Sequence, residues 1–301
     1  MTPLLPTFGL QRLFHYCSIV AIVSSYVPYQ MERMWLEHVL VPQVNSTNIR
    51  FHLWIPPYIP KFFGINHHYG QSISATLIID EEVPVYIRPL ELQNTLQRTT
   101  KYLTNIQLHR LPLISDRDVV AMEEAKSLET LILSELPIRC EFLGRLSSDR
   151  LHTVYINYCK LDDRSLQSLR CSENIVELHL IQNQLTGDCV ESIQRMPSLR
   201  RLCLQGNRVP GRDLARLESH PSLEQIDLSE ESVESWEDWK GLQRLGRSTS
   251  VSIYGKRSNG DRVMVDFRGG SISVSIRDSG YSLQVQQKLS DLSELDIDLF
   301  Q

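Results

Sequence analysis

The side chains suited to metal binding or catalysis are widely scattered along this chain. The six cysteines stand far apart without a CxxC pair, and no histidine pair has zinc-finger spacing, so a structural zinc site is disfavoured. The cysteines are Cys17, Cys140, Cys159, Cys171, Cys189 and Cys203. His67 and His68 are adjacent, so their rings diverge in a loop, and neither has an acidic or cysteine partner at a ligand spacing. We expect surface histidines rather than metal ligands, and no cofactor.

Catalytic motifs are also missing from the sequence. It holds no nucleotide-binding glycine loop, no GxSxG or HExxH motif and no paired-carboxylate motif. The formal net charge is −5 and no run of lysine or arginine exceeds two residues, so nucleic acid is not an expected partner. With 42% hydrophobic and 22% charged residues, the 301-residue chain has a globular composition. These observations favour a binding protein over an enzyme.

A motif recurs along the middle of the chain. The pattern LxxLxLxxNxL begins at positions 103, 128, 151, 175, 199 and 223, and the last four starts are 24 residues apart. A period of this length is typical of stacked repeats. The apolar alternation predicts one short strand in each unit, with its apolar side chains in a shared interior. A short helix is expected in the return segment 161–170, with Asp162 or Asp163 capping its first turn.

The ninth position of the motif follows the strand, where the backbone bends. Asn183 and Asn207 occupy it, and a buried carboxamide there can bond backbone groups that the bend leaves unpaired. Cys159 fills the same position with a weaker bond, whereas Leu111 and Leu136 cannot form one. The first two units are therefore expected to be looser at this corner.

These units resemble leucine-rich repeats over residues 103–233. The unit at residues 151–171 is similar to the cysteine-containing subclass, and the following units, with asparagine, depart toward other subclasses. The resemblance implies an α/β fold, a leucine-rich repeat solenoid shaped like a horseshoe, with the strands on its concave face.

The concave face is the expected binding surface, because side chains between the buried strand positions must point outward there. Most of these side chains are neutral and form hydrogen bonds, which suits a protein ligand better than a polyanion. Tyr155, His179 and Arg201 run diagonally across three units, and aromatic and arginine side chains are the usual anchors of protein interfaces. The alternative is that any solenoid displays such residues by chance. The predicted partner-binding residues are Tyr155, Asn157, Glu177, His179, Arg201, Gln205 and Asp227.

Near the start of the chain, an LP pair precedes LQRLFHYC and SIVAIV, and an aromatic residue follows. With these features the first 40 residues resemble an F-box, the three-helix motif that docks on the Skp-type linker of cullin-RING ubiquitin ligases. The linker-docking residues that the resemblance implies are Leu5, Pro6, Leu13, Phe14, Ile19, Ile22, Val23 and Trp35. An F-box before leucine-rich repeats implies a substrate-recognition subunit of such a ligase, with a Skp-type linker protein as a partner. The alternative is a repeat scaffold without ligase linkage, whose N-terminus only caps the solenoid.

Residues 17–27 imitate the apolar core of a signal peptide. They are too short to span a bilayer, a single Arg12 precedes them, and no A-x-A-like cleavage site follows. Together with the scattered cysteines, this favours reduced thiols and a cytoplasmic or nuclear location, without a membrane partner. The alternative, a secreted or lumenal repeat protein, requires cleavage near residue 27 and disulfides.

The segments that flank the repeats are less regular. Residues 31–41 read as a helix, and residues 74–85 read as a strand of a degenerate first unit. Trp236 and Trp239 share one face of a helix that closes the repeat core. A further strand at 251–254 and turns at Asn259-Gly260 and Gly269-Gly270 predict an antiparallel extension of the sheet.

The expected organisation therefore has five parts. They are an F-box-like helical segment (1–40), an irregular N-terminal cap with a degenerate first repeat (41–102), the repeats (103–246), a C-terminal β-rich cap (247–288) and a tail (289–301). The tail combines acidic and apolar residues, which suits either a partner-binding peptide or a frayed terminus.

Overall fold

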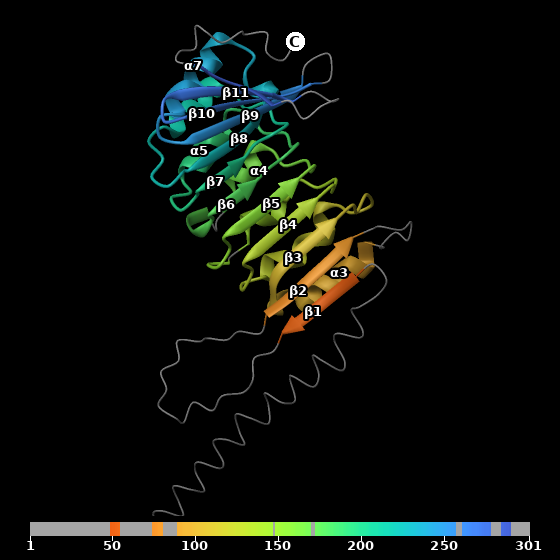
Figure 1. Ribbon diagram of the computed structural model, residues 1–301. Coiled ribbons are helices and arrows are strands. Elements are labelled where there is room, and N and C mark those ends of the chain that lie inside the picture. The colour runs from red at the N-terminus through yellow and green to blue at the C-terminus, as the bar shows by residue number, and fades with distance from the viewer. Residues whose placement is uncertain are drawn as a thin grey trace, which may run out of the picture.

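One continuous sheet organises the protein. The computed structural model describes residues 49–54, 74–80, 89–146, 148–169, 172–256, 261–277 and 284–289. Their strands form a 12-stranded sheet in which each strand lies beside its neighbours in sequence (Figure 1). The strands are β1 Ile49–Trp54, β2 Ser74–Asp80, β3 Leu103–His109, β4 Thr130–Ser134, β5 Thr153–Asn157, β6 Glu177–His179, β7 Arg201–Cys203, β8 Gln225–Ser229, β9 Ser250–Lys256, β10 Arg262–Arg268, β11 Ser271–Arg277 and β12 Gln284–Leu289.

The strands from β2 to β9 pair in parallel, one to each unit. Alternate residues of the strands from β3 to β9 point into the core in a shared register, so that Leu131 lies beside Val154 and Leu133 beside Ile156, all buried. Each of these strands contributes apolar side chains to one contiguous core that no single unit could bury alone. The chain thus folds as a leucine-rich repeat type of solenoid, and the six predicted strand positions are confirmed.

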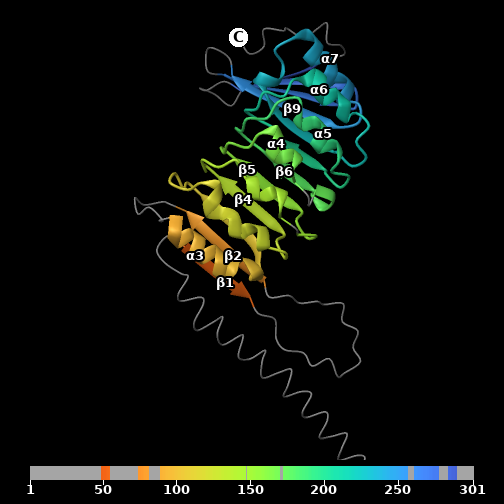
Figure 2. The ribbon, with the colours of Figure 1, turned by 180° about the vertical axis from the view of Figure 1, so that it is seen from behind.

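Short helices return the chain from each strand to the next and cover the other face of the sheet (Figure 2). The α-helices are α3 Pro89–Thr99, α4 Asp163–Gln167, α5 Cys189–Gln194, α6 Gly211–Leu214 and α7 Trp236–Leu245. The 3-10 helices are η3 Thr100–Tyr102, η4 Asp116–Glu124, η5 Glu141–Gly144, η6 Ser172–Asn174, η7 Ala215–Leu217 and η8 Glu230–Ser232. In α4 the predicted cap is confirmed, because the Ser165 N–H donates to Asp162 Oδ1 at 2.8 Å.

The backbone turns in the same way at the exit of five successive strands. Five residues at equivalent positions of the first five units have left-handed backbone angles, with φ between 52° and 69°. They are Arg110, Glu135, Tyr158, Gln182 and Gly206. This turn carries the chain from the sheet toward the return segment in each unit. Four of the five residues are not glycine, although a left-handed conformation is strained for any residue with a Cβ.

Asn207 binds the turns of two neighbouring units together. Its Oδ1 accepts hydrogen bonds from the N–H groups of Asn183 and Leu185, both at 3.2 Å. Its Nδ2 donates to the carbonyl oxygens of Leu180 at 2.6 Å and Leu204 at 3.0 Å. The predicted role of the ninth position is thus confirmed for Asn207.

Asn183 repeats this arrangement one unit earlier. Its Oδ1 accepts from the N–H of Leu161 at 3.3 Å, and its Nδ2 donates to the carbonyl oxygen of Ile156 at 2.6 Å. Cys159, at the same position of the preceding unit, places its thiol 3.4 Å from the carbonyl oxygen of Asn157. The predicted series of two carboxamides and a weaker thiol is therefore present in the structure.

The end of the solenoid is closed by α7 and by antiparallel strands. Trp239 is buried on the inner face of α7 and packs 6.1 Å from the ring of Phe267 in β10, while Trp236 is partly buried. Strand β9 continues the parallel stack beside β8, and β10, β11 and β12 follow in antiparallel order. The predicted closing helix and antiparallel extension are confirmed. The N-terminal end has a similar antiparallel partner, because β1 pairs antiparallel with β2.

Helix α3 was not predicted from the sequence. Residues 41–102 were expected to be irregular apart from one strand, but Leu92 and Leu96 of α3 are buried in the core. Their single i, i+4 pair is too short for apolar periodicity to indicate a helix. No helix in the described ranges is long and apolar enough to cross a membrane.

Some predictions fall on residues that the structure does not describe. They concern the linker-docking residues Leu5, Pro6, Leu13, Phe14, Ile19, Ile22, Val23 and Trp35, the helix at 31–41, the His67-His68 pair, Cys17, Cys171, the Asn259-Gly260 turn and the tail beyond residue 289.

Candidate functional site: the strand face

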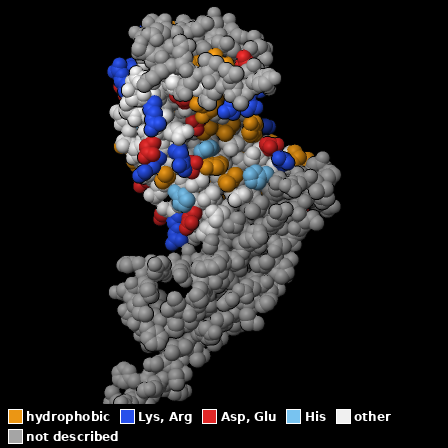
Figure 3. Space-filling model, in the orientation of Figure 1, with side chains coloured by type: hydrophobic (Ala, Val, Ile, Leu, Met, Phe, Trp, Pro, Cys, Tyr) orange, Lys and Arg blue, Asp and Glu red, His pale blue; other side chains and the backbone are white. Residues whose placement is uncertain are grey.

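The face of the sheet opposite the helices, here called the strand face, carries a row of side chains that are direct neighbours across successive strands. The strand register joins them in the order Tyr155, His179, Cys203, Asp227, Ser252 and Asp266, from β5 to β10. Figure 3 views this face and shows apolar, cationic, acidic and histidine side chains exposed together. The repeat therefore places three of the predicted binding residues in one line.

Four of the predicted residues form a contact network, here called the Tyr155 cluster. The rings of Tyr155 and His179 stack with centroids 4.2 Å apart and an interplanar angle of 32°. Glu177 links this pair to the next strand, since its Oε1 lies 3.1 Å from His179 Nε2 and its Oε2 accepts from Arg201 at 2.7 Å. The glutamate side chain is only 16% exposed, whereas that of Arg201 is 54% exposed. The cluster thus exposes the guanidinium of Arg201 to solvent and largely covers the carboxylate of Glu177.

The charges in the cluster hold one another in fixed protonation states. Burial, with a contribution from the nearby Glu177 carboxylate, raises the pKa of Tyr155 to about 12. Burial is the largest single influence on Glu177 and by itself would raise its pKa. The hydrogen bonds from Arg201 and Tyr155, together with the nearby Arg201 charge, outweigh burial and hold the pKa of Glu177 below its ordinary value. At neutral pH the cluster therefore contains a neutral phenol, a carboxylate and a guanidinium.

Cys203, between His179 and Asp227 in the row, is placed differently from the expectation. Its outward position on β7 predicted an exposed side chain, but the thiol residue is only 4% exposed. Burial raises the pKa of the Cys203 thiol to about 11, so it is not an activated nucleophile. His179 is engaged with Glu177. The described part of the chain contains no group of three histidine, cysteine or acidic residues arranged to hold a metal ion.

The remaining predicted residues lie apart from the Tyr155 cluster. Asp227 accepts hydrogen bonds from Gln225 Nε2 at 3.1 and 3.2 Å, and burial raises the pKa of its carboxyl group. Asn157 uses its Oδ1 to accept from the backbone N–H of Ile181 at 3.0 Å, so its side chain joins β5 to the segment that follows β6. Gln205 lies on the border of a pocket at the carboxyl ends of the strands.

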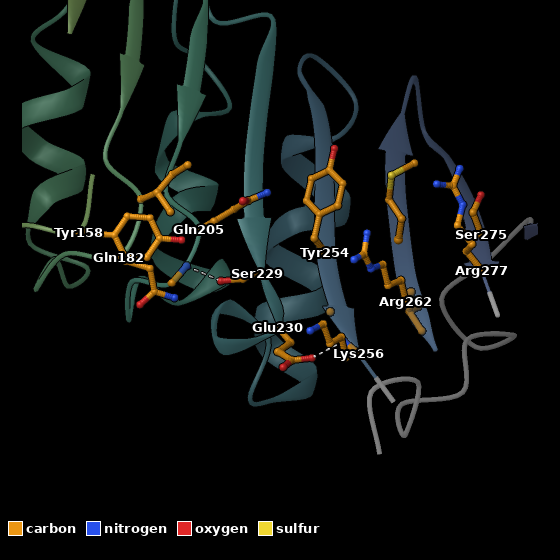
Figure 4. A pocket seen from close by; sticks show the side chains of 15 residues that line it. Tyr158, Gln182, Gln205, Ser229, Glu230, Tyr254, Lys256, Arg262, Ser275 and Arg277 are labelled. Atoms are coloured by element: carbon orange, nitrogen blue, oxygen red, sulfur yellow. Dashed lines mark hydrogen bonds between the residues drawn. The ribbon is translucent and has the colours of Figure 1, made fainter. Parts of the chain in front are cut away.

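This pocket, here called the cap pocket, lies where the last parallel strands meet the antiparallel cap. It has a volume of about 660 Å³. Its lining consists of Tyr158, Ile181, Gln182, Gln205, Gly206, Ser229, Glu230, Tyr254, Gly255, Lys256, Arg262, Val263, Met264, Ser275 and Arg277. Figure 4 shows Tyr158 and Gln182 on one side, Arg262 and Arg277 on the other, and Tyr254 between them.

Of the pocket residues, the partner-binding residues predicted from the sequence include Gln205 but none of the aromatic and cationic side chains. Tyr158 and Gln182 follow the strands, outside the alternating positions. Arg262 and Arg277 belong to antiparallel strands whose register the 24-residue period does not give. The outward alternation within 262–268 and 271–277 is the signal that would have placed Arg262 and Arg277 on the strand face.

Comparisons with known proteins give little beyond this geometry. No protein-family model matches the sequence, and no curated protein matches it significantly. Among solved structures, the chain is similar to an internalin from Listeria monocytogenes, with 17% sequence identity and a TM-score of 0.38. The match covers 51% of this chain and 42% of the internalin chain, so it spans less than half of that protein. At this level the similarity carries no argument about function, and the repeat assignment rests on the sheet itself.

Proposed function

We propose that this chain binds a protein partner through the Tyr155 cluster on its strand face. The observation that carries the proposal is the Glu177 carboxylate, which contacts both His179 and Arg201 and so fixes an exposed guanidinium beside a stacked aromatic pair. Arginine and tyrosine are enriched among the residues that dominate binding energy at protein interfaces. Because the cluster is ordered without a ligand, less side-chain entropy is lost on binding than for free side chains.

The charges of this face favour a protein over a polyanion. Arg201 is bound to Glu177, and Asp227 and Asp266 lie further along the same row. A phosphate backbone would meet these carboxylates, whereas a protein surface can place a carbonyl, a hydroxyl or a carboxylate against the exposed guanidinium of Arg201. We assign the protein no bond-breaking or bond-forming reaction of its own.

The test compares Tyr155→Ala and Arg201→Ala with Arg200→Ala as a matched control. Arg200 is also exposed and pairs with Glu224 at 3.3 Å, but it takes no part in the cluster. A partner recovered with the full chain is titrated against each variant by calorimetry. We expect the two cluster variants to lose roughly 2 kcal/mol of binding free energy, about 30-fold in affinity, and the control to bind as the wild type does. Unchanged affinity in both cluster variants would refute the proposal.

The finer proposal is that the bound protein is a ubiquitination target and that residues 1–40 hold a Skp-type linker. It is supported by the F-box resemblance of that segment, ahead of leucine-rich repeats. Co-purification of the full chain with the linker protein tests it, and deletion of residues 1–40 should abolish the interaction while Arg201→Ala leaves it intact. If the full chain does not bind the linker, the alternative of a repeat scaffold without ligase linkage holds.

A cytoplasmic or nuclear location is part of the same proposal. The four cysteines in the described ranges, Cys140, Cys159, Cys189 and Cys203, are free thiols. Titration of the denatured natural protein with a thiol reagent should find six reactive thiols. A smaller number that rises after reduction would favour the secreted or lumenal alternative.

A further inference from the structure

We propose that the cap pocket binds an acidic, extended segment of the partner protein, with carboxylates against its cations and apolar side chains against its tyrosines. The inference rests on the proposed function, since it adds a second contact area to the same strand face. It assigns a ligand chemistry to residues outside the Tyr155 cluster.

The cations of the pocket stand in a row across three antiparallel strands. Lys256 is the register partner of Arg262, and Arg262 is the register partner of Arg277. All three side chains are exposed, and none forms an ion pair with another described residue. Like charges directly opposite each other destabilise a sheet. An anionic ligand would offset this repulsion, which makes the row, here called the cation row, a binding feature rather than a folding feature.

One carboxylate lines the same pocket but does not neutralise the row. Glu230 accepts a hydrogen bond from the backbone N–H of Lys256 at 3.0 Å. This bond directs the Glu230 carboxylate to the backbone at the end of β9. The ammonium group of Lys256 forms no ion pair with Glu230. The pocket therefore keeps two positive charges in excess of its single negative charge.

Exposed aromatic rings form the other wall of the pocket. Tyr158 is 57% exposed and Tyr254 is 39% exposed, two of the few large apolar side chains that the described surface displays to this extent. Met264 is the register partner of Tyr254 and extends the apolar area toward the cation row. The carboxamides of Gln182 and Gln205 add donors and acceptors beside the rings. Such a mixture suits a peptide that alternates acidic and apolar side chains.

Gly206 shapes the floor of the pocket between the rings. A Cβ at this position would overlap the carboxamide of Gln182 where it now lies, so that side chain would have to move. Its N–H donates to Ser229 Oγ at 2.6 Å. The hollow is therefore formed by ordered contacts and not by an accidental gap between loops.

The size of the cation row favours a peptide over nucleic acid. Neighbouring strands lie about 4.8 Å apart, so three cations extend over roughly 10 Å. Two carboxylates at alternate residues of an extended peptide span about 7 Å, which fits within this length. A longer polyanion would continue onto Asp227 and Asp266 of the strand face, and the formal net charge of the chain is −5.

The experiment uses the full chain and a fluorescein-labelled peptide of alternating glutamate and leucine, followed by fluorescence anisotropy. A glutamine–leucine peptide of the same length and an oligothymidylate of equal charge serve as the other probes. We expect the glutamate peptide to bind, with an affinity that falls as salt is added. The double variant Arg262→Gln/Arg277→Gln should weaken binding by about 10-fold, because it removes two exposed ion pairs.

Arg268→Gln is the matched control, because Arg268 is an exposed cation at the opposite end of β10, beside Ser271. It should leave the affinity of the peptide unchanged. The double variant should also unfold at the same temperature as the wild type or a higher one, since it removes a repulsion. Lost binding therefore cannot be attributed to lost folding.

Three outcomes would overturn the inference: equal binding of the glutamine peptide, an equal loss in Arg268→Gln, or oligothymidylate binding as tight as that of the glutamate peptide. The two proposals fail separately. Tyr155→Ala and Arg201→Ala test the partner site and should not change binding of the glutamate peptide, whereas the double variant tests the cap pocket alone.

Discussion

Replacing Asn207 by alanine should destabilise the solenoid more than the same change at Asn183, which holds the ninth position of the motif one unit earlier. Asn207 is 1% exposed, and its Oδ1 is the acceptor for two backbone N–H groups, those of Asn183 and Leu185. Alanine would leave both donors and the carbonyl oxygen of Leu180 unpaired. A buried backbone group without a partner costs about 1–3 kcal/mol, so the two donors alone predict a loss of about 2–6 kcal/mol.

Asn183→Ala provides the matched comparison, because Asn183 is only partly buried and its Oδ1 serves one N–H group, that of Leu161. Its expected cost is about 1–3 kcal/mol, and water can reach part of the vacated space. The free energy of unfolding is measured by urea denaturation, with circular dichroism and tryptophan fluorescence as separate probes. Coincident transitions and equal m-values are required, because repeat arrays can unfold in parts. If Asn183→Ala costs as much as Asn207→Ala, or if Asn207→Ala costs less than about 1 kcal/mol, the reasoning is wrong.

Three further predictions concern single positions. Gly241→Ala should lower the free energy of unfolding, measured by urea denaturation, by about 1–3 kcal/mol, because its Cβ would lie 2.5 Å from the carbonyl oxygen of Gly211. Alanine favours a helix more than glycine does, so a gain in stability would contradict the close packing at Gly241. Gly206→Ala should cost about 1–2 kcal/mol at a φ of +69°, seen as a lower melting temperature, and an unchanged value would exclude strain there. The raised pKa of Tyr155 stabilises the fold below pH 10, and this stabilisation is lost as the pH rises through about 12. Glu177→Gln should lower that pKa toward 10 without reaching it, because burial remains, and ultraviolet titration against Tyr155→Phe measures the shift; a pKa that does not move would remove the carboxylate from the cluster.

The architecture was predictable because its signal is repeated. Six units that share apolar positions specify strand, turn and core together, and the strand face follows from simple alternation. The same alternation placed Tyr155 and His179 outward on adjacent strands, where their rings stack. The carboxamides of Asn183 and Asn207 could be assigned because their position in the motif has one physical demand, the pairing of backbone groups at a bend.

The details of the site were less predictable because they depend on neighbours across strands. Nothing in the sequence of β6 shows that Glu177 contacts both His179 and Arg201, or that Asn157 is committed to the N–H of Ile181. Cys203 is covered although its position points outward. The cap pocket needs the register of antiparallel strands, which the turn chemistry suggests and the repeat period does not fix.

The left-handed residues at the strand exits distinguish side chains that help the protein fold from side chains that serve its surface. Glycine relieves such a backbone at no steric cost, yet the chain uses it only at Gly206 and keeps side chains at four equivalent exits, each with a strain of about 1 kcal/mol. The side chains of Arg110 and Glu135 form an ion pair with each other at 3.5 Å. Tyr158 and Gln182 instead border the cap pocket. Tyr158 and Gln182 therefore keep a side chain where glycine would relieve backbone strain, and that side chain faces the cap pocket. These two residues are the first to test for a role in binding rather than in folding.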